Sequence, residues 1–179
     1  MRVGKCGLLV ALVSGILALT GCGSSSADEA AAPSATPEAP SGFQPCTDVP
    51  QAVLDSEELR NRTPDDATAG GIVWDGCMWL QTDGYSVGIR TTNMTLEMVK
   101  GKNFPGTEGF EAGGRPAVVS QQGEAPLNAS CNVNVQMVGG SLEFLLSNPP
   151  SRSKTGHLDT CELVRNLASK VAPNIPAAA

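Results

Sequence analysis

The clearest pattern along the chain is an alternation of apolar and polar residues between positions 131 and 147. Residues 131–137, CNVNVQM, place Cys, Val, Val and Met at every second position, a period that predicts a strand with one buried face. Gly139-Gly140 predicts a two-residue turn, after which residues 142–146 continue the alternation. The pairs expected across this hairpin are Met137 with Leu142, Val135 with Phe144, and Val133 with Leu146.

A second hairpin is predicted between residues 72 and 92. A three-residue loop, 82–84, with Gly84 in the left-handed conformation, places Trp79 opposite Val87 and Cys77 opposite Ile89. This register buries the cysteine and the indole together. Residues 115–121, RPAVVSQ, predict a further strand that begins near a proline.

Three helices are expected around these strands. The last has a capping-box spacing between Asp159 and Glu162 and an apolar stripe that ends before Pro173. A helix over residues 48–60, capped by Asp48, and a short helix over residues 95–100 are also predicted. The order α-β-β-α-β-β-β-α indicates an α+β fold, an antiparallel sheet with helices packed on one face and two disulfides.

The first 22 residues have the pattern of a secretory leader. Two cationic residues precede an apolar run of 13 residues, positions 7–19. As a helix this run would be roughly 20 Å long, short of the roughly 30 Å hydrocarbon core, which favours a cleaved signal peptide over a permanent span. The next residues, Leu19-Thr20-Gly21-Cys22, resemble the lipobox of bacterial lipoproteins, which implies that Cys22 is acylated and residues 1–21 are removed. The alternative is an ordinary signal peptide followed by an unmodified cysteine.

Residues 22–42 are expected to be a lipidated cysteine followed by a flexible tether. Positions 23–42 contain five Ser, six Ala and three Pro and no large apolar side chain, so the segment cannot bury enough surface to offset the entropy of ordering it. The single folded α+β domain is predicted over residues 43–176. Formal net charge is −6 for the whole chain, and an acidic chain without a basic cluster argues against a nucleic-acid partner.

Four cysteines remain once Cys6 and Cys22 are set aside. They are Cys46, Cys77, Cys131 and Cys161. An even number outside the membrane, where the compartment is oxidising, indicates two disulfides, and spacing alone leaves three pairings open. We expect the sequential pairing, in which each bond closes a loop of about 30 residues and contributes roughly 3.5 kcal/mol. A zinc site built from all four thiolates is the alternative, which the missing C-x₂₋₄-C spacing disfavours.

Several of these motifs together resemble a known family, the actinobacterial lipoproteins that carry domain of unknown function 3558. The resemblance rests on short motifs in order along the chain, Pro45-Cys46, Cys77-Met78-Trp79, Gly114-Arg115-Pro116-Ala117, the strand from Cys131 to Val135, and the segment from Cys161 to Ala168. It spans about residues 45–176. It implies an anchored extracytoplasmic lipoprotein without an assigned reaction, and no catalytic residues or cofactors.

Two groups of polar residues are candidates for ligand binding. Arg115 lies between two glycines and a proline, where it is a candidate ligand for a carboxylate or phosphate, or else a structural arginine at a strand end. The polar row Asn132, Asn134 and Gln136, with Glu143, is a candidate for a polar ligand such as a glycan. A solvated sheet face explains this row better.

Candidates for catalysis are few. His157 is the only histidine, and a Ser–His–Asp site with Asp159 is disfavoured because residues so close in sequence rarely face each other as a triad requires. Asp65 and Asp66 suggest a solvated loop rather than a calcium site. The sequence therefore favours a noncatalytic lipoprotein on the outer face of the cytoplasmic membrane, which binds an envelope protein or glycan. The alternatives are a cell-wall hydrolase and a purely structural lipoprotein.

Overall fold

The computed structural model describes residues 38–122 and 129–179. The predicted leader, Cys22 and the tether up to residue 37 lie outside the described residues. The helices are α1 (Pro45–Asp48), α2 (Gln51–Ser56), α3 (Leu96–Gly101), α4 (Thr160–Val171) and the 3₁₀ helix η1 (Ala172–Asn174). The strands are β1 (Leu59–Pro64), β2 (Ala67–Ala69), β3 (Ile72–Gln81), β4 (Ser86–Thr92), β5 (Glu108–Ala112), β6 (Arg115–Ser120), β7 (Ser130–Met137) and β8 (Gly140–Ser147).

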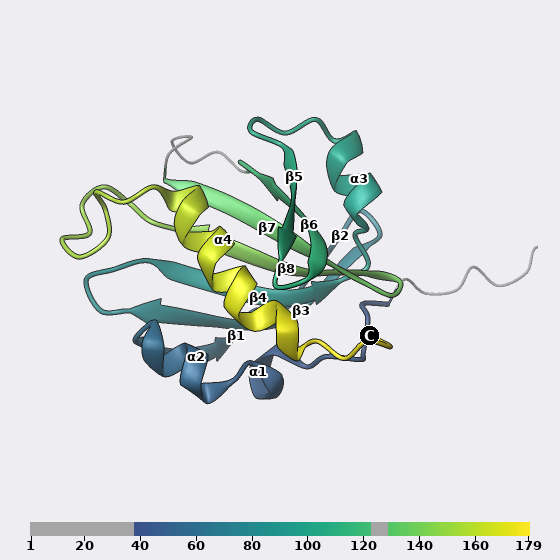
Figure 1. Ribbon diagram of the computed structural model, residues 1–179, viewed down its shortest axis with the longest axis horizontal. Helices are drawn as coiled ribbons and strands as arrows, with labels where there is room; N and C mark the ends of the chain where they lie inside the picture. The colour runs from purple at the N-terminus through teal and green to yellow at the C-terminus, as the bar shows by residue number, and fades with distance from the viewer. Residues whose placement is uncertain (1–37, 123–128) are drawn as a thin grey trace, which may run out of the picture. The chain divides into compact units, whose positions relative to one another are not determined.

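The strands form one antiparallel sheet of eight strands, in the order β1-β3-β4-β8-β7-β6-β5, with β2 paired to β3 beside β1 (Figure 1). The two long hairpins, β3–β4 and β7–β8, are joined through β4 and β8 at the centre of the sheet. This arrangement places residues 72–92 beside residues 140–147, although the short helix α3 and three further strands separate them in the chain.

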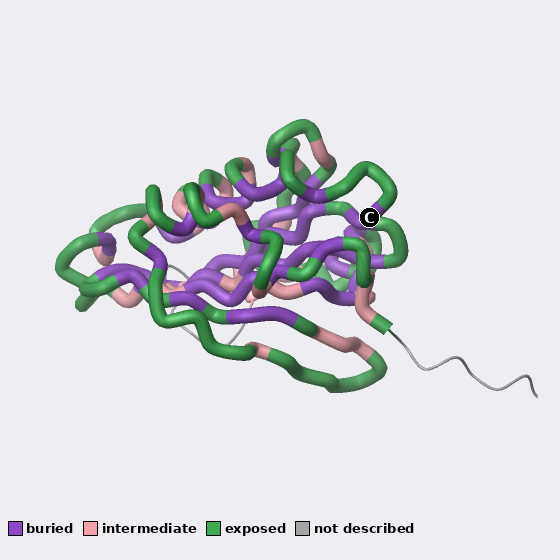
Figure 2. The backbone as a smooth tube through the Cα atoms, turned by 90° about the horizontal axis from the view of Figure 1, so that it is seen from below, coloured by how far each residue is buried: buried purple, intermediate pink, exposed green. Residues whose placement is uncertain are grey.

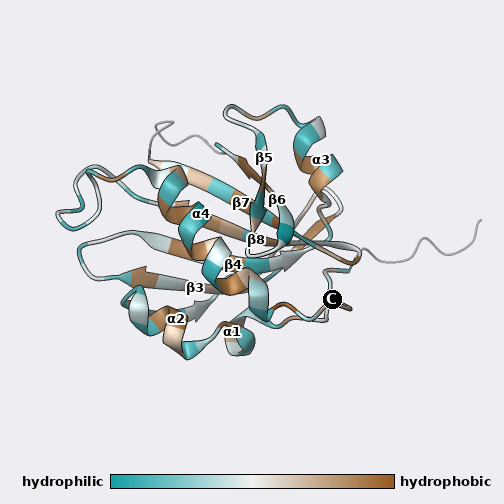
Figure 3. Ribbon diagram, viewed as in Figure 1, coloured by the Kyte–Doolittle hydropathy of each residue, from teal (hydrophilic) through white to brown (hydrophobic). Residues whose placement is uncertain are grey.

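The main hydrophobic core lies between one face of the sheet, here the first face, and helices α1, α2 and α4. Helix α4 contributes Val164, Leu167, Ala168 and Val171, all completely buried. These residues recur at helical spacing, and Figure 3 shows hydrophobic and hydrophilic residues on the same helix, as expected for one that covers a sheet. The strands below are buried along most of their length, whereas the turns are exposed (Figure 2). The prediction of this helix and its Asp159 cap is confirmed.

Helix α3 lies against the other face of the sheet, here called the second face. Leu96 and Val99 pack on Val118, whose neighbours Ala117 and Val119 point into the main core. Thr95 caps this helix by accepting a hydrogen bond from the Met98 amide at 3.3 Å. The predicted α+β class with an antiparallel sheet is confirmed, and α3 adds a second, smaller hydrophobic cluster on the face opposite α4.

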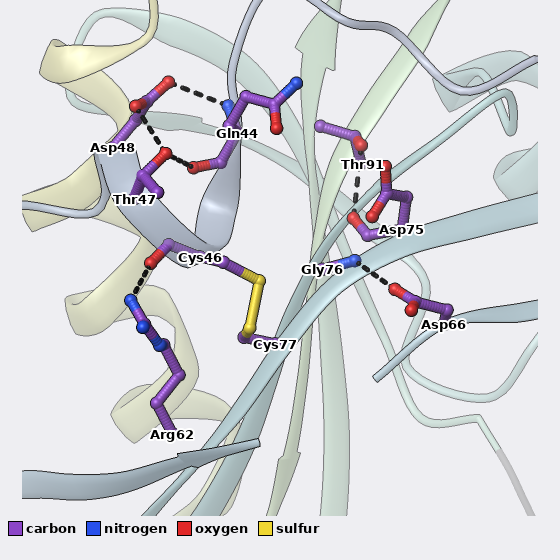
Figure 4. The surroundings of a disulfide bond; sticks show 10 residues. All are labelled: Gln44, Cys46, Thr47, Asp48, Arg62, Asp66, Asp75, Gly76, Cys77 and Thr91. Carbon is purple, nitrogen blue, oxygen red and sulfur yellow. Dashed lines mark hydrogen bonds between the residues drawn. A yellow bond between two sulfur atoms is a disulfide. The ribbon is translucent and has the colours of Figure 1, made fainter. Parts of the chain in front are cut away.

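Both predicted disulfides are present. The α1–β3 disulfide joins Cys46 to Cys77, and the β7–α4 disulfide joins Cys131 to Cys161, with Cα–Cα distances of 5.3 and 5.2 Å. Figure 4 shows the first of them bridging α1 and the middle of β3. Because Cys77 and Cys131 both point into the main core, the two bonds attach helices to the first face only.

The register of the β3–β4 hairpin is confirmed, with Trp79 opposite Val87 and Cys77 opposite Ile89. The left-handed residue in its loop, however, is Asp83 with φ of 53°, and not Gly84. A Cβ at position 84 would lie 1.9 Å from Oε1 of Gln81, so a side chain there would force the Gln81 side chain to move.

The predicted register of the β7–β8 hairpin is wrong by two residues. Met137 pairs with Gly140, and Val135 pairs with Leu142, so the turn consists of Val138 and Gly139. Gly139 adopts the positive φ of 79°, whereas a Cβ on Gly140 would lie 1.9 Å from the carbonyl oxygen of Thr92. Contact with β4 therefore keeps Gly140 inside the strand, and the side chains still face the predicted sides.

The predicted helix over residues 48–60 is confirmed only over residues 51–56, and both of its predicted ends are wrong. Asp48 is the last residue of α1, and α2 begins after Pro50 and ends at Ser56. Pro50 interrupts the segment because it has no amide hydrogen to donate. From Leu59 the chain forms β1, where Leu59 alone is buried. The strands β1, β2 and β5 were not predicted, since their exposed polar residues lack a regular alternation.

Candidate functional site

The predicted polar row of β7 and β8 is buried rather than solvated. Asn132, Asn134 and Glu143 are 3%, 0% and 2% exposed, and only Gln136 is exposed. The expectation of a solvated sheet face is therefore wrong. The chain that leads into α3 covers part of this face, because the Ser141 hydroxyl donates to the carbonyl of Met94 at 2.6 Å.

The two asparagines have hydrogen-bonding capacity that the described chain does not use. Asn134 donates through Nδ2 to Oγ of Ser141 at 3.0 Å. The Oδ1 atoms of Asn134 and Asn132 are both buried and have no partner among the described residues. A buried acceptor without a donor costs about 1–3 kcal/mol, so both oxygens are suited to receive a donor from a bound molecule or water.

A buried ion pair lies beside these asparagines. Arg90 of β4 and Asn134 of β7 are the two residues opposite Glu143 of β8 in the sheet register. The Arg90 guanidinium donates to Oε1 of Glu143, and the side chains are 12% and 3% exposed. Oε2 of Glu143 accepts a hydrogen bond from the indole Nε1 of Trp74 at 3.2 Å. Each carboxylate oxygen therefore has its own donor, which holds the charge in place.

Asp65 completes the charge balance around Arg90. Its Oδ1 lies 3.6 Å from Nη1 of Arg90, and a Cβ on Gly88 would lie 2.4 Å from its Oδ2. The carboxylate therefore lies over the glycine on the second face. The guanidinium is also 5.8 Å from the ring of Trp74, within the range of a cation–π interaction. Nε of Arg90 is buried without a partner among the described residues.

We call Trp74, Arg90, Asn132, Asn134 and Glu143 the second-face cluster. It combines a fixed charge pair, an indole and two amide oxygens, which are groups that orient a polar ligand through hydrogen bonds. Sequence reasoning found the asparagines and Glu143 but missed Arg90 and Trp74. The alternation of apolar residues along β3 and β4 indicated which side chains of these strands face the core. Nothing in the sequence indicated that β4 pairs with β8, which is what brings Arg90 and Trp74 to Glu143.

Arg115 does not belong to this cluster. It lies at the start of β6 with its guanidinium directed to backbone carbonyls: Gln136 at 3.3 Å, Ile175 at 2.7 Å, and Pro176. A hollow of about 190 Å³ next to it is lined by residues of β6, the β7–β8 turn and the C-terminal segment. The arginine therefore attaches the C-terminal segment to the sheet, which corresponds to the structural role weighed for it above.

The histidine and the aspartates considered for catalysis lie in separate places. His157 is exposed, and Oδ1 of Asp159 accepts a hydrogen bond from the amide of Glu162 at 2.8 Å as the cap of α4. Asp66 accepts a hydrogen bond from the amide of Gly76 at 3.1 Å. Burial, together with the nearby Asp66 carboxylate, raises the pKa of Asp75 (Figure 4).

One further titratable group joins the helices to the sheet. Tyr85, which precedes β4, donates its hydroxyl to Oε2 of Glu57 at 2.7 Å, and Oε1 of Glu57 accepts from Lys170 of α4. Burial is the main cause that raises the pKa of Tyr85, and its hydrogen bond to Glu57 adds to the effect. This chain of contacts connects the end of α2, β4 and α4.

Metal-binding groups and membrane-spanning helices are both absent from residues 38–122 and 129–179. These residues contain no group of three or more His, Cys, Asp or Glu side chains arranged to hold a metal ion. They also contain no helix with the length and hydropathy needed to cross a bilayer. Cys22, the predicted lipidation site, lies outside them.

Comparison with known proteins places the chain in a family. A search of curated proteins and a search of solved structures each found no match. A family model described as "Protein of unknown function (DUF3558)" matches residues 17–174. The match includes every element of the sheet, both disulfides and the second-face cluster. Because it covers well over half of the sequence, the chain belongs to the DUF3558 family.

Proposed function

We propose that this protein is a noncatalytic lipoprotein, anchored on the outer face of the cytoplasmic membrane, that binds an envelope protein or glycan through the second-face cluster. The observation that carries the binding proposal is the pair of buried, unpartnered amide oxygens of Asn132 and Asn134 beside the Arg90–Glu143 ion pair. Both atoms are closed to solvent in the unbound protein, so the proposal requires that binding opens this face, after which donors such as sugar hydroxyls would satisfy both oxygens.

The membrane location is supported by the sequence before the folded domain. An apolar run that is too short to span a bilayer precedes Leu19-Thr20-Gly21-Cys22, and a segment rich in Ser, Ala and Pro follows. Acylation with two or more chains would give stable anchoring, whereas a single chain gives marginal binding. Two disulfides also suit a domain in an oxidising compartment.

Two measurements test the anchor. Cells that produce the full chain are labelled with radioactive palmitate, and we expect label in the wild type and none in Cys22→Ala. The same Cys22→Ala protein should leave the membrane fraction. Unlabelled wild type, or wild type found in the cytosol with its leader intact, would contradict the proposal.

The binding proposal is tested by crosslinking in intact cells, followed by recovery of the protein and identification of what is attached. We expect a specific protein or glycan on the wild type and a loss of that attachment in Asn132→Ala/Asn134→Ala. The matched control is Gln136→Ala, which changes an exposed residue of the same strand and face. Equal attachment to the double variant and the wild type, with both shown to be folded, would refute the assignment of this surface.

A further inference from the structure

A groove lies between α2 and the edge strand β1, on the side of the sheet away from the second-face cluster. Its volume is about 430 Å³, within the range of about 300–1,000 Å³ typical of small-ligand sites. Leu54, Leu59 and Trp79 form an apolar floor, and Gln51, Arg60, Asn61 and Arg62 form the rim. Two guanidinium groups thus stand above an apolar surface.

The backbone of β1 is shaped around this groove. Arg60 pairs with Leu80 and Thr63 pairs with Met78, so that Asn61 and Arg62 together oppose the single residue Trp79. This is a β-bulge, and Asn61 within it takes a left-handed φ of 55°. The bulge redirects the side chain of Arg62, because an unbulged strand would place residues 61 and 62 on opposite faces.

The Arg62 side chain is bonded to the backbone of Cys46, one of the two cysteines of the α1–β3 disulfide. Its Nη1 donates to the carbonyl oxygen of Cys46, the residue that is bonded to Cys77. Figure 4 shows the guanidinium reaching from β1 to this carbonyl beside the disulfide. One edge of the guanidinium is therefore fixed, and donors remain for a second partner.

The charges around the groove leave Arg62 without an acidic partner in the described chain. Asp55 pairs with Arg60 at 3.0 Å between exposed groups, and Glu58 pairs with Lys154 at 2.6 Å. Glu57 accepts hydrogen bonds from two side chains, as described above. Asp48 accepts from the amide of Gln44 at 2.8 Å. Each nearby carboxylate thus has a partner, whereas no ion pair of Arg62 exists among the described residues.

We propose that this groove binds an amphiphilic anion, that is, a carboxylate or phosphate group carried on an apolar stem. Arg62, assisted by Arg60, holds the anionic group, because guanidinium groups bind carboxylate and phosphate oxygens with paired hydrogen bonds. The stem lies on the floor of Leu54, Leu59 and Trp79. The anion is either a free amphiphile or a lipid headgroup in a bilayer, and the experiment separates these sources. The site is independent of the second-face cluster.

Calorimetric titration of residues 38–179, which contain every described element and both disulfides and whose folding is checked by circular dichroism, with dodecanoate and dodecyl phosphate below their micelle concentrations tests the proposal. We expect saturable binding of both anions and at least about tenfold weaker binding by Arg62→Gln, because a hydrogen bond to a charged group is worth about 1.5–3 kcal/mol. The control is Lys102→Gln, which removes an exposed cation at the end of α3, on the other face of the sheet, and should change the affinity less than twofold. Uncharged octaethylene glycol dodecyl ether, which carries no sugar that the second-face cluster could bind, should bind more weakly than either anion.

The position of the bound anion is tested in a Trp74→Phe variant, in which Trp79 is the only tryptophan. Dodecanoate should shift the emission of Trp79, which lies in the floor of the groove. Vesicles of anionic phosphatidylglycerol, compared with neutral phosphatidylcholine, form the second arm. Binding to these vesicles that Arg62→Gln weakens identifies a lipid headgroup, and binding of the monomeric anions alone identifies a free amphiphile.

The proposal is overturned if neither anion nor anionic vesicles bind, if octaethylene glycol dodecyl ether binds as well as dodecanoate, or if Arg62→Gln binds as the wild type does. Replacing both cysteines of the α1–β3 disulfide by alanine gives a second check, because the Cys46 carbonyl would then be less fixed. We expect weaker anion binding by this variant at a temperature where it remains folded. These results are independent of the crosslinking test of the second-face cluster.

Discussion

The buried ion pair between Arg90 and Glu143 allows a quantitative test of the second-face cluster. We consider two single substitutions, Arg90→Met and Glu143→Leu, and the double variant that contains both. Arg90→Met leaves the Glu143 carboxylate, 3% exposed, with only the indole of Trp74 as donor. Glu143→Leu leaves the Arg90 guanidinium, 12% exposed, with the longer 3.6 Å contact to Asp65 as its remaining ion pair among the described residues.

The size of the effect follows from this burial. Removal of one partner of a buried pair typically costs 3–5 kcal/mol, because the other charge stays in a medium that solvates it poorly. Replacement of both partners by apolar residues of similar volume is often close to neutral. We therefore expect each single variant to lose about 3–5 kcal/mol of unfolding free energy, and the double variant to lose less than either.

Urea denaturation of the oxidised domain measures these values, followed by tryptophan fluorescence and far-ultraviolet circular dichroism. Coincident transitions from the two probes justify a two-state treatment. All variants keep both tryptophans and both disulfides, so the probes and the covalent restraints are the same in every sample. The measurement is repeated in 1 M salt, which should change the coupling little because the pair is shielded from solvent.

Additive losses would refute this reasoning. If the double variant loses the sum of the two single losses, Arg90 and Glu143 act independently and the charge pair does not organise the cluster. Losses below about 1 kcal/mol in both single variants would likewise mean that the groups are solvated as exposed pairs are.

Three further predictions concern other parts of the molecule. Replacement of both cysteines of the β7–α4 disulfide by alanine should lower the unfolding free energy by about 3.5 kcal/mol in urea denaturation, since it frees a loop of about 30 residues; an unchanged midpoint would contradict this. Gly140→Ala should lower the unfolding free energy by about 1–3 kcal/mol in the same assay, because the added Cβ would lie 1.9 Å from the Thr92 carbonyl oxygen. The control is Gly101→Ala, whose added Cβ would have no atom within 4 Å, and it should change the unfolding free energy by less than about 1 kcal/mol. Asp66→Asn should lower the pKa of Asp75 in a carboxyl-carbon NMR titration. Because folding raises the Asp75 pKa, the wild type should lose stability as pH rises through that pKa, and the variant should lose less; an unmoved pKa would leave burial as the only cause.

The sequence predicts the parts of this fold in which side chains alternate strictly between core and solvent. The β3–β4 register was predictable because only one loop length buries Cys77 and Trp79 together. The β7–β8 register was not, because two adjacent glycines allow two turns that bury the same side chains. The choice between them depends on Thr92 of β4, and contacts between distant strands cannot be inferred from a local period.

The polar cluster was only partly predictable for a related reason. A row of Asn, Asn and Gln beside a glutamate resembles a solvated face in a single strand. Its burial depends on α3 and on the pairing of β4 with β8, which brings Arg90 to Glu143. Likewise, β1 has one buried residue and a bulge, so its charged sequence predicts neither a strand nor the groove beside it. Tertiary contacts that override local preference set these features.

The uneven placement of the two disulfides has a consequence for how the molecule adapts. Both bonds restrain the helical side, so rearrangement there would have to stretch or twist a covalent link. The side that bears α3 is held by noncovalent contacts alone within the described chain. Substitutions and small changes in backbone position should therefore accumulate on that side as the family diverges. Relatives would then share the disulfide-bonded helical side and differ in the surface that they offer to ligands.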